Sequence, residues 1–314
     1  MALGGAHTIH ACRHHFGWNP ENSPVHTVAP GETLEFDVID SAGGEITPDM
    51  TSRDLANVDH SKFAPLTGPI FVDGAEPGDA VKITFHDFAP SGWGWSGVTT
   101  LFGILPDHFP DPHLKIWHYD RSGSVPAMYN DIASVPLKPF PGIIGLSPAA
   151  PGTHSALPPY PTGGNLDTRD LSVGTELFLP VEVAGGLLSV GDTHAAQGHG
   201  ELAGTALESP MSLAITIDLV KDMRLPGPQF VTAGPVTRHL DSAGYYGTCG
   251  VNEDLVEAAR LATLQMIDLL QRDHGLDAMD AYLLCSVCGD LCISEMVNRP
   301  VNVVTLYFPR CVFD

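Results

Sequence analysis

The chain has 314 residues, of which 43% are hydrophobic and 17% are charged, a composition that excludes a disordered chain. With 37 acidic against 15 basic residues, its net charge of −22 argues against nucleic acid and anionic membranes as partners.

Several segments have the two-residue periodicity of strands with one buried face. In residues 33–40, Leu34, Phe36 and Val38 alternate with acids, and residues 79–88 follow the same pattern. Further strands are predicted at 113–119, 175–183, 186–190 and 212–220. Between residues 106 and 164 the chain is rich in Pro, Gly and His, so we expect mainly long loops over the β core there.

The periodicity changes near the end of the sequence. Residues 251–275 have apolar side chains at helical spacing, with Asn252 as the expected cap and Gly275 as the stop. A second helix is predicted over residues 277–291 and a final buried strand over residues 301–308. The expected fold is a mainly β protein, a large sandwich with long loops and a late helical pair. We expect one domain over 1–314, β-rich in 1–248, with the helices and final strand in 249–314.

The sequence has neither a transmembrane segment nor the pattern of a disulfide scaffold. No run of eighteen apolar residues occurs and the first residues lack an apolar signal core, so the expected location is the cytoplasm. Cys285, Cys288 and Cys292 lie close together, but no second pair has zinc-site spacing. We interpret them as small buried hydrophobes, with a metal or redox role as the alternative.

The stretch "GDTHAAQGHGELAGTALE" (191–208) concentrates acids and histidines between two apolar runs. In an extended segment Asp192 and His194 project to the same face, as two ligands of Zn²⁺ or another divalent ion would. Glycines then permit a turn that returns Gln197, as an orienting group, and Glu201, as a general base. The alternative is a polar hairpin whose side chains only satisfy the turn backbone.

Other segments offer candidates whose structural alternatives are stronger. Asn165 and Asp167 follow a Gly-Gly pair, which is also typical of an Asx turn. Glu76 lies in "EPGD", which by itself reads as a turn that feeds a strand. Asp40 ends a strand at a Gly-Gly turn, where it could hold a carboxylate over a cleft. The N-terminal histidines His7, His10, His14 and His15 are interleaved with apolar residues, so some are expected in a packed strand.

Serine chemistry is poorly supported, because the sequence has no G-x-S-x-G elbow. No glycine-rich phosphate loop follows a strand and opens a helix. By elimination, water activated by a metal ion and a carboxylate is the leading chemistry.

Four motifs together resemble the acetamidase/formamidase family, in the family's order. They are "PLTGPIFVDGAEPGD", "GGNLDTRDL", "GDTHAAQGHGELAGTALE" and "LLCSVCGDLCISEMVNRPVNVVTLYFPR". The resemblance implies hydrolysis of a short aliphatic amide to carboxylate and ammonia on a jelly-roll-like sandwich. It also implies a divalent metal, zinc first and calcium as the alternative, and a homo-oligomer (a dimer or higher).

The resemblance also marks candidate site residues. The matching positions are Asp40, Glu76, Asn165, Asp167, Asp192, His194, Gln197, Glu201 and Glu208. We expect Asp192, His194, Asp40 and Asp167 at the metal, and Glu201, Gln197 and Glu76 in catalysis. Asn165, Glu208 and His199, which stands where the family often has an acid, are expected to bind substrate or to surround the ligands. The alternatives are hydrolysis of a different linear or cyclic amide by the same fold, and a non-catalytic member that binds a metal or small molecule.

Overall fold

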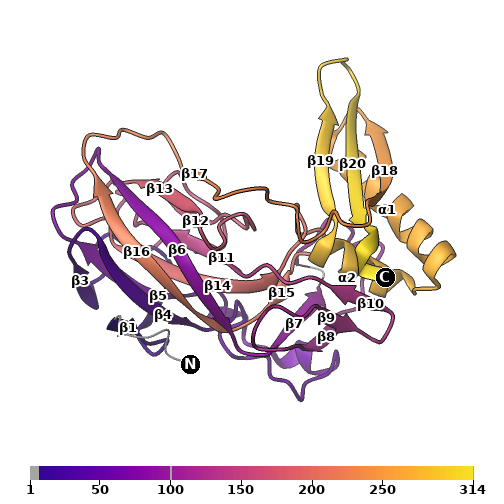
Figure 1. Cartoon of the computed structure of the whole chain (residues 1–314), viewed down its shortest axis with the longest axis horizontal. Coiled ribbons are helices and arrows are strands. Elements are labelled where there is room, and N and C mark those ends of the chain that lie inside the picture. The colour runs from indigo at the N-terminus through magenta and orange to yellow at the C-terminus, as the bar shows by residue number, and fades with distance from the viewer. Residues whose placement is uncertain (1–6, 100, 314) are drawn as a thin grey trace.

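The computed structural model describes residues 7–99 and 101–313. Strands are the main regular structure of this chain, with two helices near the C-terminus (Figure 1). The predicted mainly β fold with a late helical pair is therefore confirmed.

The first large sheet pairs six strands in the order β1-β4-β16-β6-β13-β17 within the described residues. They are β1 (His7–Ile9), β4 (Glu32–Val38), β16 (Met211–Val220), β6 (Ala80–Pro90), β13 (Glu176–Pro180) and β17 (Gln229–Val231). The segments predicted at 33–40, 79–88, 175–183 and 212–220 all lie here.

The second large sheet carries the candidate site. Its main path runs β12-β11-β14-β15-β7-β8, and β5 joins β14 and also pairs with β2 and β3. The bounds are β2 (His14–Phe16), β3 (His26–Val28), β5 (Pro65–Val72), β7 (Trp93–Val98), β8 (His113–His118), β11 (Phe140–Gly145), β12 (Gly163–Asn165), β14 (Leu188–Ala196) and β15 (Leu207–Glu208).

The two large sheets pack through one hydrophobic core. Phe36, Phe85 and Ile215 from the first sheet and Ile144 and Val190 from the second belong to the same buried cluster. Their alternation with outward-facing residues is the period-two pattern seen in the sequence. β14 is instead buried along its whole length, because it lies in the middle of its sheet with structure on both faces.

The C-terminal part forms an arm that stands off from the two sheets (Figure 1). Its strands β18 (Tyr245–Asn252), β20 (Asn302–Pro309) and β19 (Asp290–Glu295) pair in the order β18-β20-β19. The helices are α1 (Leu255–His274) and α2 (Ala278–Cys288). A hairpin of β9 (Ala127–Tyr129) and β10 (Ala133–Val135) and the 3-10 turns Asp54–Asn57, His60–Lys62 and Arg310–Phe313 complete the elements. None of the helices in the described residues is long and apolar enough to cross a membrane.

The final strand predicted over residues 301–308 is confirmed as β20, and it lies in the separate sheet on which α1 packs. The structure corrects two expectations. Asn252 ends β18, and the side chain of Asp254 caps α1 by accepting the backbone N–H of Glu257. Residues 106–164, expected as mainly loops, include β11, which lies inside the second sheet.

The cysteines agree with the buried-hydrophobe interpretation in part. Cys285 and Cys288 are buried on α2, whereas Cys292 is half-buried on β19. The side chains that lie close enough to hold a metal ion, among the described residues, include no cysteine.

Candidate active site

A row of paired residues crosses the second sheet and places the central histidine. Phe140 on β11 pairs with His194 on β14, His194 pairs with Glu208 on β15, and Glu208 pairs with Trp95 on β7. Directly paired residues have Cβ atoms about 5 Å apart, so their side chains meet on one face. Asp192, two residues before His194, joins the same face, as the sequence spacing predicts.

His194 is fully buried and contacts acids on one side and an amide on the other. Its Nδ1 donates to Oε1 of Gln197 at 2.8 Å, which leaves Nε2 to face the acids. Nε2 lies 3.0 Å from Oδ1 of Asp192 and 3.1 Å from Oε2 of Glu208. Gln197 also donates from Nε2 to the backbone oxygen of Asp167, so it ties the histidine to the loop after β12.

Two triads of ligand-type side chains share His194. One is Asp167, His194 and Glu201, and the other is Asp192, His194 and Glu208; in each, the ligand atoms lie within 4.8 Å of one another. In the first triad, Oδ1 of Asp167 is buried without a hydrogen-bond partner. A carboxylate oxygen left without a partner in a buried site is typical of a position where a cation or substrate belongs.

Burial and mutual repulsion raise the pKa values of three of the acids. Burial, together with neighbouring carboxylates, raises the pKa of Asp192 to about 7. Burial alone accounts for most of the rise of the pKa of Asp167 to about 7. Burial and the charge of Asp167 raise the pKa of Glu201 well above its usual range. At neutral pH Glu201 therefore favours the neutral form, and Asp167 and Asp192 are partly protonated, unless a positive charge joins them.

His194 supplies one such charge. Burial disfavours its imidazolium, but the carboxylates of Glu208 and Asp192 outweigh burial and raise its pKa well above the usual value. Burial likewise opposes the charge of Glu208, yet His194 lowers the pKa of that carboxyl overall. The hydroxyl of Ser41 also donates to Glu208, at 2.8 Å. His194 and Glu208 thus form a buried ion pair at the centre of the site.

The backbone at three of the acids is strained. Asp167, Asp192 and Glu201 have φ of 45°, 50° and 43°, in the left-handed region that residues with a Cβ rarely adopt. Such conformations persist only where the surrounding structure enforces them, and they gather at functional sites.

Glycines stand at positions where the cluster leaves no space for a Cβ atom. A Cβ on Gly142 of β11 would lie 2.7 Å from Cε1 of His194 and 2.8 Å from Oδ1 of Asp167. In the turn before Glu201, Gly200 has φ of +101° as predicted, whereas Gly198 is needed because a Cβ there would lie 2.0 Å from the backbone oxygen of Gly289.

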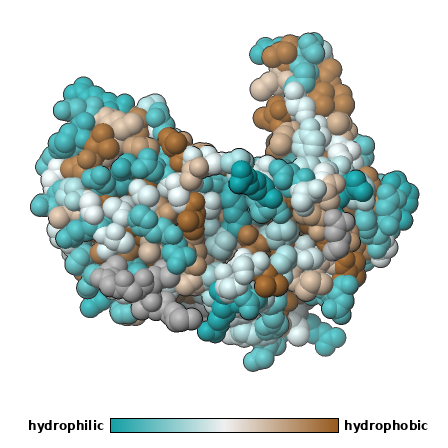
Figure 2. Space-filling model, viewed as in Figure 1, coloured by the Kyte–Doolittle hydropathy of each residue, from teal (hydrophilic) through white to brown (hydrophobic). Residues whose placement is uncertain are grey.

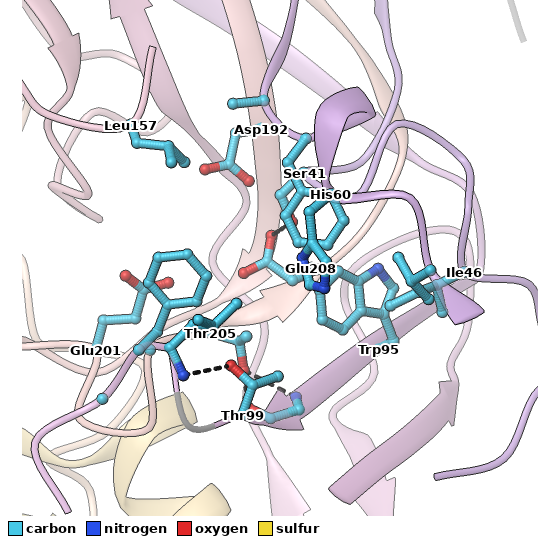
Figure 3. Close-up of a pocket in the computed structure, with 18 of the residues that line it drawn as sticks. Ser41, Ile46, His60, Trp95, Thr99, Leu157, Asp192, Glu201, Thr205 and Glu208 are labelled. Carbon is cyan, nitrogen blue, oxygen red and sulfur yellow. Dashed lines mark hydrogen bonds between the residues drawn. The ribbon is translucent and has the colours of Figure 1, made fainter. Parts of the chain in front are cut away.

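The cluster opens into a cavity of about 420 Å³ (Figure 3). Asp167, Asp192, Glu201 and Glu208 line it together with Asn165, whose Oδ1 is buried without a partner.

Three expected site residues lie differently. Asp40 is in neither triad: its carboxylate accepts the indole N–H of Trp95 and the backbone N–H of Ala42. Burial raises its pKa to about 6, with a further contribution from Asp192 nearby. Glu76 is exposed in the turn between β5 and β6, and His199 lies outside the cavity, 4.0 Å from Asp170. The structure does not bring Glu76 or His199 into the cluster.

The N-terminal histidines also lie outside the cavity. His10 contacts Asp37 at the surface, His15 contacts the hydroxyl of Ser189, and His7 stacks on His26. His14 is exposed on β2.

The sequence prediction missed four contributors. Arg169 is buried, forms a bidentate ion pair with Asp290 at the start of β19, and donates to the backbone oxygen of Gln197. Ser41 and Trp95 donate hydrogen bonds to Glu208 and Asp40. Arg169 and Asp290 lie inside two of the quoted motifs, but their spacing does not show that they meet, because the sheet pairing and the return of the chain from the arm bring them together.

A cavity lined by acids around one buried histidine, on a rigid sheet, is typical of an enzyme site for a small molecule. The sequence pattern of the Acetamidase/Formamidase family matches residues 6–155 and 150–314. The chain belongs to this family.

Related proteins agree with this assignment. A formamidase of Methylophilus methylotrophus is 28% identical in an alignment of 370 positions that covers 96% of this chain and 89% of the relative. Among solved structures, a gamma lactamase from Delftia acidovorans has a TM-score of 0.88 at 27% identity, with 96% of this chain and 90% of that chain covered. An acetamidase from Bacillus halodurans has a TM-score of 0.69 at 29% identity, with 96% and 97% covered. The chain is thus an amidohydrolase by family.

Proposed function

We propose that this chain hydrolyses a carboxamide to carboxylate and ammonia with help from a divalent metal ion. The observation that carries the proposal is the cluster of four acids around His194 at the wall of a cavity. Among the described residues that line the cavity, none is a lysine or arginine, so the one positive charge of His194 faces four acids. A bound cation would supply the missing positive charge.

The donor set fits a metal ion. Asp192, His194 and Glu208 would hold it once Nε2 of His194 has released its proton, which leaves Glu201 as the general base, and the partnerless Oδ1 of Asp167 is an available further ligand atom. The imidazole favours zinc, whereas calcium prefers oxygen ligands alone. When bound, such an ion polarises an amide carbonyl and lowers the pKa of a water molecule.

The side chains around the ion have separate tasks. Gln197 accepts from Nδ1 of His194 and so keeps Nε2 directed at the acids. Glu201 takes the proton of the attacking water and returns it to the leaving nitrogen, since amide nitrogen leaves only after protonation. A raised pKa suits a carboxyl that must give its proton back.

Ammonia release from formamide and acetamide tests the reaction, with elemental analysis of the same sample. We expect Glu201→Gln to lower kcat by about 10²–10⁴ while the fold and metal content are kept. Glu21→Gln, at an exposed surface position, is the matched control and should retain full activity. Unchanged kcat in Glu201→Gln would remove its assigned role. Full activity after complete chelation would remove the metal, and bound metal without turnover of any amide would favour a non-catalytic binding protein.

A cyclic amide is the second candidate substrate. The TM-score to the gamma lactamase is 0.88, against 0.69 for the acetamidase, so the backbone of this chain is more similar to that of the lactam-hydrolysing relative. Opening a lactam ring releases no ammonia but creates an amine. Amine formation from a γ-lactam, compared with ammonia release from acetamide, separates the two candidates.

We propose the cytoplasm as the location and a homo-oligomer, a dimer or higher, as the working form. Cys12, Cys249, Cys285, Cys288 and Cys292 are free thiols, and the chain carries a large negative charge. Free thiols favour a reducing compartment. The net charge disfavours nucleic acid and anionic membranes as partners.

A further inference from the structure

The lining of the cavity combines acids with large apolar side chains. The four acids and Asn165 lie among the lining residues, and so do six of the larger apolar side chains. These are Ile46, Phe63, Trp95, Leu101, Phe102 and Leu157. Figure 3 shows Glu201 and Asp192 around the same space as Leu157, Trp95 and Ile46.

The apolar residues reach from the interior to solvent. Ile46 and Trp95 are 2% and 5% exposed, whereas Leu101, Phe102 and Leu157 are 62%, 38% and 46% exposed. Large apolar side chains that remain exposed together at the opening of a cavity mark a binding surface. A ligand that extends from the acids along these side chains would remove them from water.

The volume of the cavity also favours a substrate larger than formamide or acetamide. At about 30 Å³ for each water molecule, 420 Å³ holds about fourteen waters. Formamide and acetamide carry only a hydrogen atom or a methyl group beside the amide, so either would leave most of the apolar surface in contact with water. A ligand that fills such a cavity is of ordinary metabolite or drug size.

The charges of the lining residues restrict the class of substrate further. No lysine or arginine lines the cavity among the residues that the structure describes, and the four acids outnumber its one lining histidine, His60, so an anionic group on the substrate would be repelled without a strong cationic partner. A cationic tail would extend along the apolar residues, where it would lose hydration without a partner. The remaining class is neutral and apolar.

We propose that the preferred substrate is a neutral primary amide whose acyl part is a bulky apolar group, such as an aromatic ring or a branched hydrocarbon. The inference rests on the proposed function and identifies its substrate class. The amide lies at the acids, and the apolar group covers Leu157 and the neighbouring apolar side chains.

The test compares kcat/KM for formamide, acetamide, phenylacetamide, anionic succinamate and cationic 6-aminohexanamide with the metal-replete enzyme. Because each apolar group that fills a fitting pocket contributes about tenfold or more, we expect phenylacetamide to exceed acetamide by at least about 100-fold. Succinamate and 6-aminohexanamide should be the poorest of the longer amides. If acetamide or a charged amide is preferred, the inference fails and the proposed function stands; if no amide is cleaved, the proposed function itself fails.

A substitution in the cavity tests whether its apolar residues select the substrate. Leu157→Trp narrows the cavity at an exposed position whose backbone oxygen, not its side chain, binds Asn165. We expect it to lower the ratio of kcat/KM for phenylacetamide over acetamide by about tenfold. Val173→Trp, at a similarly exposed residue outside the cavity, should leave that ratio unchanged. Equal ratios in the two variants would show that the apolar surface does not select the substrate.

Discussion

Asp167 has a strained backbone conformation and a buried side chain, and the burial disfavours its charged form. Its φ is 45°, one carboxylate oxygen is buried without a partner, and burial raises its pKa to about 7. The folded protein therefore holds this proton more tightly than the unfolded chain does. Its contribution favours folding at low pH and is lost as the pH rises from about 4 through 7.

Asp167→Asn should consequently stabilise the metal-free protein at pH 8 but not at pH 4. We expect a gain of about 1–3 kcal/mol at pH 8, because the variant no longer buries an unpaired carboxylate, and about 2–4 °C in Tm for each kcal/mol. Thermal unfolding of chelated samples at both pH values measures this. Asp111→Asn, at an exposed position, serves as the control. A gain of equal size at both pH values would contradict the assignment.

Gly142 is required by space and not by its backbone angle. An added Cβ would meet His194 and Asp167 at distances below 3 Å. Gly142→Ala should lower stability by about 1–3 kcal/mol through overpacking. It should reduce kcat by about 10²-fold, because displacing reacting groups by a fraction of an ångström is costly. Gly227→Ala, where a Cβ meets nothing within 4 Å, should leave both quantities unchanged. Normal kcat in Gly142→Ala would show that the cluster tolerates displacement.

Spacing in the sequence predicts contacts within one strand, and it succeeds for Asp192 and His194. It cannot predict which strand lies alongside, so the pairing of His194 with Glu208 through β15 was not derivable from it. For Glu76 the sequence predicts the local turn but not the position relative to the site. Pro and Gly specify the turn, whereas the structure places Glu76 at the surface, where its backbone N–H donates to Asp79.

At the level of elements, the strands with clear alternation are the ones that the sequence predicts well. β4, β6 and β16 each have one face on the core and one outside it, so their pattern is visible. β11 and β14 are buried on both faces, and β11 reads "FPGIIG", where Pro and Gly suggest a loop. Both strands build the site. Its sheet was therefore the hardest part to predict from the sequence.

The ion pair of Arg169 and Asp290 joins two elements distant in sequence. Arg169 lies two residues after Asp167, and Asp290 begins β19 of the arm and also accepts the backbone N–H of His199. The pair thus fixes the loop that carries Asp167 against the base of the arm.

Removing one partner of the Arg169–Asp290 ion pair should lower the free energy of unfolding more than removing both. Arg169→Met or Asp290→Asn alone leaves an uncompensated buried charge, at a cost of about 3–5 kcal/mol. The double variant leaves none, so it should be at least about 2 kcal/mol more stable than the sum of the single effects predicts. Denaturant unfolding of the four proteins measures the coupling. Additive losses would mean that the two charges act independently.

On the scale of the whole molecule, the arm differs from the rest of the surface. The chain carries a net charge of −22, yet β18 has no charged residue and residues 289–309 contain only Asp290, Glu295 and Arg299. Val251, Ile293, Met296, Val297 and Tyr307 are exposed large apolar residues there. Figure 2 shows apolar residues gathered on the arm, which stands away from the two large sheets.

This surface is where a second copy of an acidic chain meets the least repulsion. Two copies with strong like charge repel over most of their surfaces, and the apolar arm offers both the weakest repulsion and the largest gain from burial. We therefore expect the arm to form the contact of the proposed homo-oligomer. Because Asp290 connects the arm to Arg169 beside the site, assembly there would also support the loop that carries Asp167.

Val251→Asp combined with Val297→Asp should convert the oligomer to single chains. Each substitution places a buried charge in the contact, and both positions are exposed in the single chain, at 55% and 80%, so folding should be kept. Light scattering after gel filtration measures the mass, and circular dichroism checks the fold. Val173→Asp, at a residue 55% exposed on another part of the surface, adds charge without touching the arm and should leave the mass unchanged. An oligomer that persists in the double variant but dissociates in Val173→Asp would place the contact elsewhere.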